Sequence, residues 1–196
     1  MVTTVPVIFD FACPWTYSAR NREKQLAKEL GVSFEHLPWE LNPTAPAEGM
    51  PNPYAVPGDA LLAFARSTGT PLRGRPVTHN TRKALRGLFF ARTHGKYDEY
   101  VDAGLQAYWQ EQANLADDAV LRRIAERAGL DADAFLRFVN DDAMDGYLSA
   151  VDAWAEKLGV ATTVTYLLPT KEGGPSLYQG LGTHEEVRAA LKAALA

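Results

Sequence analysis

The first forty residues carry the pattern that constrains the fold most strongly. Residues 5–11 (VPVIFDF) form a short apolar run before a turn, which is typical of a buried strand. Pro14 suits the first position of a helix, and the apolar face that follows ends at Gly31, a common helix stop. Residues 32–37 alternate enough to form a second strand. Since two strands joined by a helix are usually parallel, the chain is expected to begin with a parallel βαβ unit.

The middle of the chain is expected to be helical. Residues 42–58 contain five prolines, which exclude a regular element and leave a linker into an insertion or a substrate-covering loop as equal alternatives. Helical periodicity then runs almost without a break through residues 60–158. It is clearest in the last helix, where Tyr147 and Trp154 belong to one apolar face that closes at Gly159. These aromatic side chains are expected in the core.

The hydrophobic period changes after Gly159. Residues 162–168 (TTVTYLL) are β-branched and aromatic, as expected of a strand, and residues 176–179 follow a glycine turn as a return strand. Thr183 opens a capping box that starts a final helix. The predicted order is therefore β-α-β, a helical block of about a hundred residues, and β-β-α, which defines an α/β protein with a large helical segment.

Composition excludes several classes of protein. The 196 residues are 46% hydrophobic and 22% charged, as in a soluble globular protein of one domain or one domain with an insertion. A net charge of −4 without a basic stripe argues against nucleic acid as a partner. The chain has no apolar run long enough for a membrane span and no signal peptide at its start. Its single cysteine cannot form an intrachain disulfide, so a cytoplasmic location is expected.

The lone thiol of Cys13 is the most reactive group that the sequence offers. At a strand-to-helix junction its sulfur faces free backbone N–H groups and the positive end of the helix dipole, which are expected to lower the thiol pKa. A thiolate is a good nucleophile even without a partner base. The alternative is a buried structural cysteine. Thr16 follows one turn later, where its hydroxyl either hydrogen-bonds the thiolate or only packs or caps the helix.

Five segments of the chain match, in order, the motifs of a known family. They are residues 10–17 (DFACPWTY), 39–43 (WELNP), 80–86 (NTRKALR), 108–131 (YWQEQANLADDAVLRRIAERAGLD) and 158–168 (LGVATTVTYLL). The first resembles the motif D-x-x-C-P-W-C-Y of the FrnE-like branch of the DsbA family. The likeness covers nearly the full chain and implies a thioredoxin-like fold with a large all-helical insertion. It implies a thioredoxin-like domain of residues 1–41 and 159–196, and an insertion of residues 42–158.

Two departures from that family carry functional information. Thr16 stands where the family has a second cysteine, which resolves mixed disulfides. Val164, preceded by Thr163, stands where the family has a cis-proline opposite the first cysteine. A cis bond before a residue other than proline costs about 3 kcal/mol, so a trans bond and a reshaped loop are expected here. Dithiol exchange is therefore not expected, whereas the nucleophile and its helix are retained.

The expected activity is cis–trans isomerisation of a conjugated small molecule, either free or bound to a carrier, through reversible addition of the Cys13 thiolate. Hydroxychromene-carboxylate isomerases and kappa-class glutathione transferases are similar in architecture and use a serine to activate glutathione, which implies that this scaffold supports isomerisation. The catalytic residues would then be Cys13 and Thr16. The candidate substrate-binding residues are Pro14, Trp15, Trp39, His79, Asn80, Thr163 and Val164, of which His79 is also a candidate proton donor.

Other properties and functions are left as expectations or alternatives. No metal site is expected, because no group of histidine, cysteine and acidic residues has the spacing of metal ligands. No resident cofactor is expected, although glutathione is a candidate, and a homodimer stays open. Two alternative functions also stay open. One is an atypical monothiol oxidoreductase that needs glutathione to resolve its mixed disulfide, and the other is a binding module without catalytic activity.

Overall fold

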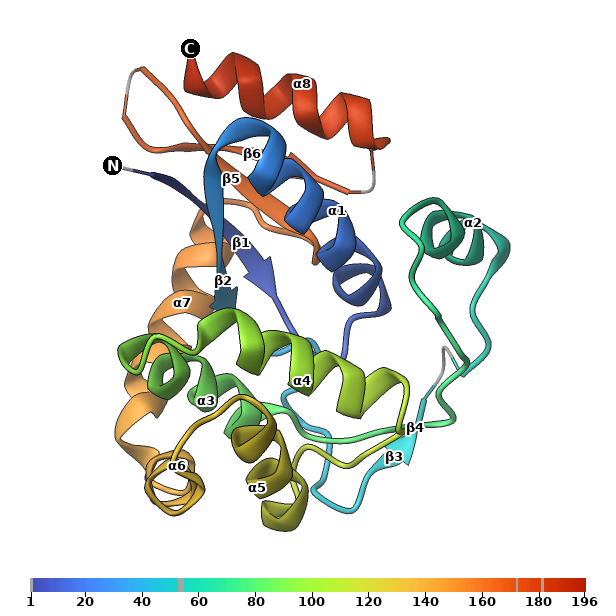
Figure 1. Ribbon diagram of the computed structural model, residues 1–196, viewed down its shortest axis with the longest axis vertical. Coiled ribbons are helices and arrows are strands. Elements are labelled where there is room, and N and C mark those ends of the chain that lie inside the picture. The colour runs from blue at the N-terminus through green and yellow to red at the C-terminus, as the bar shows by residue number, and fades with distance from the viewer. Residues whose placement is uncertain (1, 53–54, 172, 181) are drawn as a thin grey trace.

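A four-stranded mixed sheet forms the centre of one half of the molecule (Figure 1). The computed structural model describes residues 2–52, 55–171, 173–180 and 182–196. The strands lie in the order β2 (Val32–Pro38), β1 (Thr3–Phe9), β5 (Thr165–Pro169) and β6 (Pro175–Gln179). β1 and β2 are parallel, which confirms the predicted βαβ unit. β5 runs antiparallel to both of its neighbours, β1 and β6.

Helices make up most of the remaining structure. In chain order they are α1 (Pro14–Leu30), α2 (Asp59–Ser67), α3 (Arg82–Thr93), α4 (Tyr97–Trp109), α5 (Asp118–Arg127), α6 (Ala132–Val139), the short 3-10 helix Asp142–Met144, α7 (Asp145–Lys157) and α8 (His184–Leu195). In Figure 1, α1, α7 and α8 flank the sheet, whereas α3 to α6 pack together below it. None of the helices in the described part of the chain is both long and apolar enough to cross a membrane.

Alternating apolar side chains on β1 let helices cover both faces of the sheet. Val5 and Val7 are buried on one face in a cluster with Leu26 of α1 and residues of α8. Ile8 is buried on the other face in a cluster with Ala155 of α7. The sheet therefore has a separate apolar cluster on each face. The strand-to-helix turn of Cys13 leads into α1, the helix that packs with Val5 and Val7.

The helical half has its own core, which reaches the strand-to-helix turn. Phe11 lies in that turn, is fully buried, and packs edge-on against Tyr100 of α4 with ring centroids 6.0 Å apart. Gly104 of α4 makes this approach possible, because a Cβ at that position would lie 2.5 Å from the Phe11 ring. Trp109 of α4 donates its indole N–H to the Phe11 carbonyl over 2.9 Å. The turn before α1 is thus fixed by its contacts with Tyr100, Gly104 and Trp109 of α4.

The proline-rich segment is not wholly irregular, contrary to the prediction. Met50 and Pro51 form a short strand, β3 (Met50–Pro51), that pairs antiparallel with β4 (Val77–Thr78). Proline is compatible with such an edge, since only one side of a two-residue strand has to be paired. This pair ties the segment between β2 and α2 to the chain just before α3.

The aromatic side chains of α7 are also placed differently from the prediction. Tyr147 and Trp154 are each 39% exposed. The buried face of α7 consists of Leu148, Val151 and Ala155, whose spacing of three and four residues forms one stripe. The pattern identified the helix correctly, but the smaller apolar residues face the protein and the aromatic residues lie at the margin.

Substitution of Leu26 by alanine tests the packing of α1 on the sheet. Leu26 is fully buried between α1 and the sheet, so Leu26→Ala is expected to lower the free energy of unfolding by about 2–5 kcal/mol. Val56→Ala is the matched control, because Val56 is 84% exposed, and its effect is expected within about 0.5 kcal/mol. Urea unfolding followed by circular dichroism measures both, and equal midpoints for the two variants would contradict this packing.

Candidate active site

Cys13 lies at the junction that the sequence predicts. It is the N-cap residue of α1, with an extended backbone (φ −84°, ψ 118°), and Pro14 occupies the first turn. The Cys13 N–H donates to the Asp10 carbonyl over 3.1 Å, and the Tyr17 N–H donates to the Cys13 carbonyl over 3.2 Å. These two bonds close the turn and begin the helix, so the thiol is held where backbone N–H groups are left without helical partners.

The Cys13 sulfur is buried, and this changes its acid–base behaviour. The residue is 2% exposed, and the thiol donates to the Thr163 carbonyl with 3.8 Å between the sulfur and the oxygen. Burial raises the pKa of the Cys13 thiol, although the Thr16 hydroxyl and the N–H groups of Thr16 and Trp15 act in the opposite direction. The predicted lowering of this pKa is therefore wrong for the resting structure, because loss of hydration outweighs the helix start.

Thr16 supplies a polar group beside the sulfur. Its side chain is 1% exposed, and its hydroxyl has no hydrogen-bond partner of normal geometry within the described residues. The hydroxyl is nevertheless close enough to Cys13 to favour the thiolate and to lower the thiol pKa. A buried hydroxyl without a partner costs free energy, and a thiolate at Cys13 would provide the missing acceptor.

The loop opposite the sulfur has a cis peptide bond between Thr163 and Val164, so the predicted trans bond is wrong. Val164 is fully buried in the cluster that α1 shares with the sheet, and Gly180 donates its N–H to the Val164 carbonyl over 3.2 Å. Residue type sets only the intrinsic preference of a peptide bond, and the contacts of the folded loop decide its geometry. The loop presents the Thr163 carbonyl to the thiol, as noted above.

The structure brings together only some of the predicted site residues. Pro14 and Trp15 are half-buried beside Cys13, and the Trp15 ring lies against Phe64 of α2 with centroids 6.0 Å apart. Trp39 lies elsewhere, because it packs with the cluster between the sheet and α7. Its backbone N–H donates to the Phe9 carbonyl over 2.9 Å. Trp39 therefore supports the end of β2, and no hydrogen bond or ring contact joins it to Cys13 in the described structure.

His79 and Asn80 precede α3 and have local partners. The Asn80 side chain accepts the Arg82 N–H over 2.9 Å and so satisfies one free N–H at the start of α3. The His79 ring contacts the Arg75 guanidinium over 2.9 Å. Burial and the positive charge of Arg75 lower the pKa of His79, which keeps the imidazole neutral near pH 7. Among the described residues neither side chain is hydrogen-bonded to Cys13, so their roles in substrate binding stay predictions.

Two hollows are candidates for binding, and of the two only the first adjoins α1, the helix that begins at Cys13. One has a volume of about 180 Å³ between α1 and α4, and it is lined by Tyr17, Arg20, Lys24 and Gln110 among others. Tyr17 reaches it one turn after Cys13 and accepts the Gln110 side-chain N–H over 2.7 Å. Of the two hollows this polar one is the nearer candidate for a substrate, and sequence reasoning missed it because its walls come from α1, α4 and the segment of Thr70 and Pro71, which are far apart in the chain.

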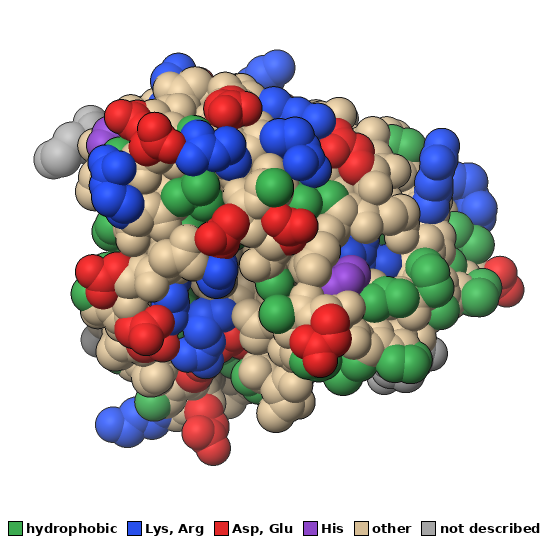
Figure 2. Space-filling model, turned by 90° about the horizontal axis from the view of Figure 1, so that it is seen from below, with side chains coloured by type: hydrophobic (Ala, Val, Ile, Leu, Met, Phe, Trp, Pro, Cys, Tyr) green, Lys and Arg blue, Asp and Glu red, His purple; other side chains and the backbone are tan. Residues whose placement is uncertain are grey.

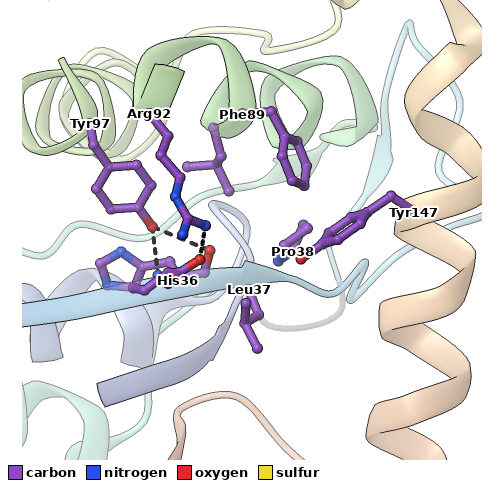
Figure 3. A pocket seen from close by; sticks show the side chains of 9 residues that line it. His36, Leu37, Pro38, Phe89, Arg92, Tyr97 and Tyr147 are labelled. Atoms are coloured by element: carbon purple, nitrogen blue, oxygen red, sulfur yellow. Dashed lines mark hydrogen bonds and ion pairs between the residues drawn. The ribbon is translucent and has the colours of Figure 1, made fainter. Parts of the chain in front are cut away.

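The other hollow lies on the outer edge of β2 and is much smaller. Figure 3 shows its walls, with His36 and Pro38 on β2, Phe89 and Tyr97 above them from α3 and α4, and Tyr147 projecting from α7 toward Pro38. Its volume is about 10 Å³. The Tyr97 hydroxyl is engaged with the backbone of His36, since it accepts the N–H over 2.5 Å and donates to the carbonyl over 3.2 Å. This hollow therefore offers little space and few free polar groups.

Surface chemistry varies across the face shown in Figure 2. Acidic and basic side chains are interspersed over most of this face, and hydrophobic side chains gather on the side of β3 and β4. Val56 and Val77 are among the exposed hydrophobic residues of that region, at 84% and 37% exposure. Within the described residues no group of three or more histidine, cysteine, aspartate or glutamate side chains is arranged to hold a metal ion.

Comparison with known proteins agrees with this architecture. Residues 4–171 match the model of the DSBA-like thioredoxin domain, and the chain belongs to this family. The predicted family resemblance and thioredoxin-like fold are therefore confirmed. The chain is similar to a 2-hydroxychromene-2-carboxylate isomerase from Sphingobium xenophagum, with 26% identity over 167 residues, or 82% of this chain and 86% of that protein.

Two solved structures show the same fold. A probable DsbA oxidoreductase from Streptomyces coelicolor superposes with a TM-score of 0.84 and 24% identity, covering 98% of this chain and 89% of that one. The cytosolic disulfide reductase DsbM from Pseudomonas aeruginosa superposes with a TM-score of 0.74 and 20% identity, covering 98% of each chain. DsbM has also been solved with GSH.

Replacement of Thr16 tests its contact with the sulfur. Since the Thr16 hydroxyl lowers the pKa of Cys13, Thr16→Val is expected to raise that pKa, and Thr16→Ser is expected to leave it near the wild-type value. The rate of Cys13 alkylation by iodoacetamide as a function of pH reports the thiol pKa, with intact-protein mass as the readout. A Thr16→Val profile that coincides with the wild type, or moves to lower pH, would show that the hydroxyl does not act on the sulfur.

Proposed function

We propose that this protein is an isomerase of small conjugated molecules and that Cys13 is its covalent nucleophile. The observation that carries the proposal is the pairing of a lone thiol at the start of α1 with the unpartnered hydroxyl of Thr16, in the place where the family has its second thiol. A nucleophile without a resolving thiol suits chemistry in which the sulfur adds and then leaves unchanged.

The mechanism follows from that arrangement. Loss of the thiol proton to a base or to water leaves a thiolate that the Thr16 hydroxyl and the N–H groups of Trp15 and Thr16 stabilise. The sulfur forms a bond to the β-carbon of an unsaturated carbonyl compound, and the π electrons move to the carbonyl oxygen. The former double bond then rotates as a single bond. Return of the electrons expels the thiolate and leaves the other isomer, with no net oxidation or reduction.

Substrate access requires a change from the resting structure. Because Cys13 is 2% exposed, the residues around it have to move before a carbon atom can reach the sulfur. Trp15, half-buried against α2, and the loop of Thr163 are the segments next to the thiol. Opening at this point would also rehydrate the sulfur and remove the main cause of its raised pKa. Substrate entry and activation of the thiol are thus coupled in this proposal.

The similarity to 2-hydroxychromene-2-carboxylate isomerase supports isomerisation and suggests the substrate class. We propose a conjugated carboxylate or carbonyl compound, either free or attached to a carrier. The reaction would use no resident cofactor and no metal, and would take place in the cytoplasm. Pro14, Trp15, Thr163 and Val164 would surround the reacting bond, and His79 would serve as a proton donor only if the opened site brings it to the substrate.

Removal of the Cys13 sulfur tests this function. Cys13→Ser is expected to lower the isomerisation rate on the order of a thousandfold or more, because serine is not ionised under conditions where a thiol is. The assay follows 2-hydroxychromene-2-carboxylate and a panel of cis-unsaturated ketones and acids by proton NMR. Val56→Ala is the control for handling and stability. Wild-type turnover by Cys13→Ser would exclude a covalent role for the sulfur.

A second candidate function is reduction of mixed disulfides with glutathione. The chain has one cysteine, so any disulfide formed at Cys13 has to be resolved by an external thiol. DsbM, whose fold is similar, has a solved structure with GSH. In this reaction the Cys13 thiolate takes the glutathione moiety from a substrate disulfide and releases the substrate thiol. A second glutathione thiolate then attacks the mixed disulfide, which frees Cys13 and yields oxidised glutathione.

Turnover of a glutathionylated peptide separates the two candidates. If the protein is an isomerase only, release of the peptide thiol in the presence of glutathione is expected at the uncatalysed rate. Catalysed release that saturates with peptide and disappears in Cys13→Ser would instead favour the reductase. Absence of both activities, together with no reaction of Cys13 with a mild electrophile at neutral pH, would favour a binding module.

A further inference from the structure

Asp10 is a buried carboxylate at the meeting point of three segments. It is fully buried, and its two oxygen atoms accept three hydrogen bonds. The Oδ1 atom accepts the Ala12 N–H over 3.0 Å and the Thr81 hydroxyl over 2.8 Å. The Oδ2 atom accepts the Leu41 N–H over 2.7 Å. Burial of a carboxylate costs free energy, which its hydrogen bonds have to offset. At Asp10 those bonds come from three separate segments, and this arrangement needs an explanation.

Each of the three partners belongs to a different segment of the chain. Ala12 precedes Cys13 in the turn that leads into α1. Leu41 follows Trp39 and Glu40 after the end of β2. Thr81 is the N-cap residue of α3 and comes directly after Asn80. One carboxylate therefore fastens the turn of the nucleophile to the chain after β2 and to the helical half of the molecule.

We propose that Asp10 is a positioning residue that holds the Cys13 turn closed over the buried thiol through its hydrogen bonds to Ala12, Leu41 and Thr81. This inference rests on the proposed role of Cys13 as a nucleophile and adds the group that controls access to it. Only a carboxylate can accept all three bonds with two oxygen atoms, because an amide would turn one of those acceptors into a donor. An amide at this position would face the Leu41 N–H with an N–H of its own.

The charges around Asp10 make this closure sensitive to pH. Burial raises the pKa of Asp10 to about 6, and the neighbouring charge of Glu40 acts in the same direction, against the three hydrogen bonds. Glu40 is in turn paired with Arg82 of α3 over 2.5 Å. In an opened turn Asp10 would be hydrated and its pKa would return toward the ordinary value, so the closed turn binds the proton more tightly, and protonation as the pH falls through about 6 is expected to favour the closed turn.

The test measures access to the Cys13 sulfur in the full chain, without any substrate. Dithiodipyridine reacts with a thiolate to form a mixed disulfide and releases one pyridinethione, whose absorbance gives the rate. After correction for the thiolate fraction, the wild-type rate constant is expected to fall as the pH falls through about 6, because the protonated carboxyl favours the closed turn. Asp10→Asn is expected to react about tenfold faster than the wild type at pH 7.5, because one hydrogen bond is replaced by a repulsive contact, and to lose that pH dependence, because the titrating carboxyl is gone.

Thr81→Val is the matched variant, since it removes one of the three bonds and leaves the carboxylate in place. Thr81→Val is expected to increase the rate by a smaller factor and to keep the fall in rate as the pH drops through about 6. A wild-type rate and pH profile in Asp10→Asn would overturn the proposal. If Asp10→Asn does not fold by circular dichroism, a flat wild-type profile together with an unchanged rate in Thr81→Val would overturn it. Because no isomerisation is measured, the result is independent of whether the proposed catalytic activity is found.

Discussion

Burial of the Cys13 thiol at the start of α1 is the constraint on which the rest of the site depends. The free N–H groups of a helix start favour a negative sulfur, whereas exclusion of water favours a neutral one. In the resting structure exclusion of water has the larger effect, and the thiol donates its proton toward the Thr163 carbonyl. In the resting structure the sulfur is therefore present as the unreactive thiol, and it lies beside groups that would stabilise the reactive thiolate.

The two halves of the molecule meet at this point, which makes the geometry of the nucleophile a property of the whole fold. Phe11, two residues before the thiol, is fixed by two contacts with α4. The Trp109 indole donates to the Phe11 carbonyl, and the absence of a side chain at Gly104 leaves room for the Phe11 ring. Arg20, on the same helix as Cys13, is paired with Asp98 and Asp102 of α4 over 2.6 and 2.8 Å. A displacement of α4 would therefore be transmitted to both ends of the segment that carries the sulfur.

Sequence patterns predicted the parts of this structure that depend on local chemistry. The strand before Cys13, the helix that begins at Pro14 and stops before Gly31, and the capping box at Thr183 all follow from residue type and spacing. The pKa of Cys13 was predicted in the wrong direction, because burial is set by residues distant in the chain. The cis bond before Val164 was missed for the same reason.

Sequence reasoning also missed features of the site that depend on contacts between distant segments of the chain. Asp10 belongs to the recognised motif around Cys13, but its importance lies in partners that are 31 and 71 residues away. The hollow beside Tyr17 exists only because α1 and α4 pack together. By contrast, Trp39 looked like part of the site from its neighbouring residues and packs instead on the far face of the sheet.

The most direct test of the account is to trap the enzyme during turnover. A reaction mixture with the protein and a conjugated cis substrate is quenched in acid after milliseconds to seconds, digested, and analysed by mass spectrometry. The account predicts that the peptide carrying Cys13 gains the mass of one intact substrate molecule, and that this adduct disappears once the isomers reach equilibrium. Steady isomerisation with the Cys13 peptide unmodified at every time point would contradict covalent catalysis by this thiol.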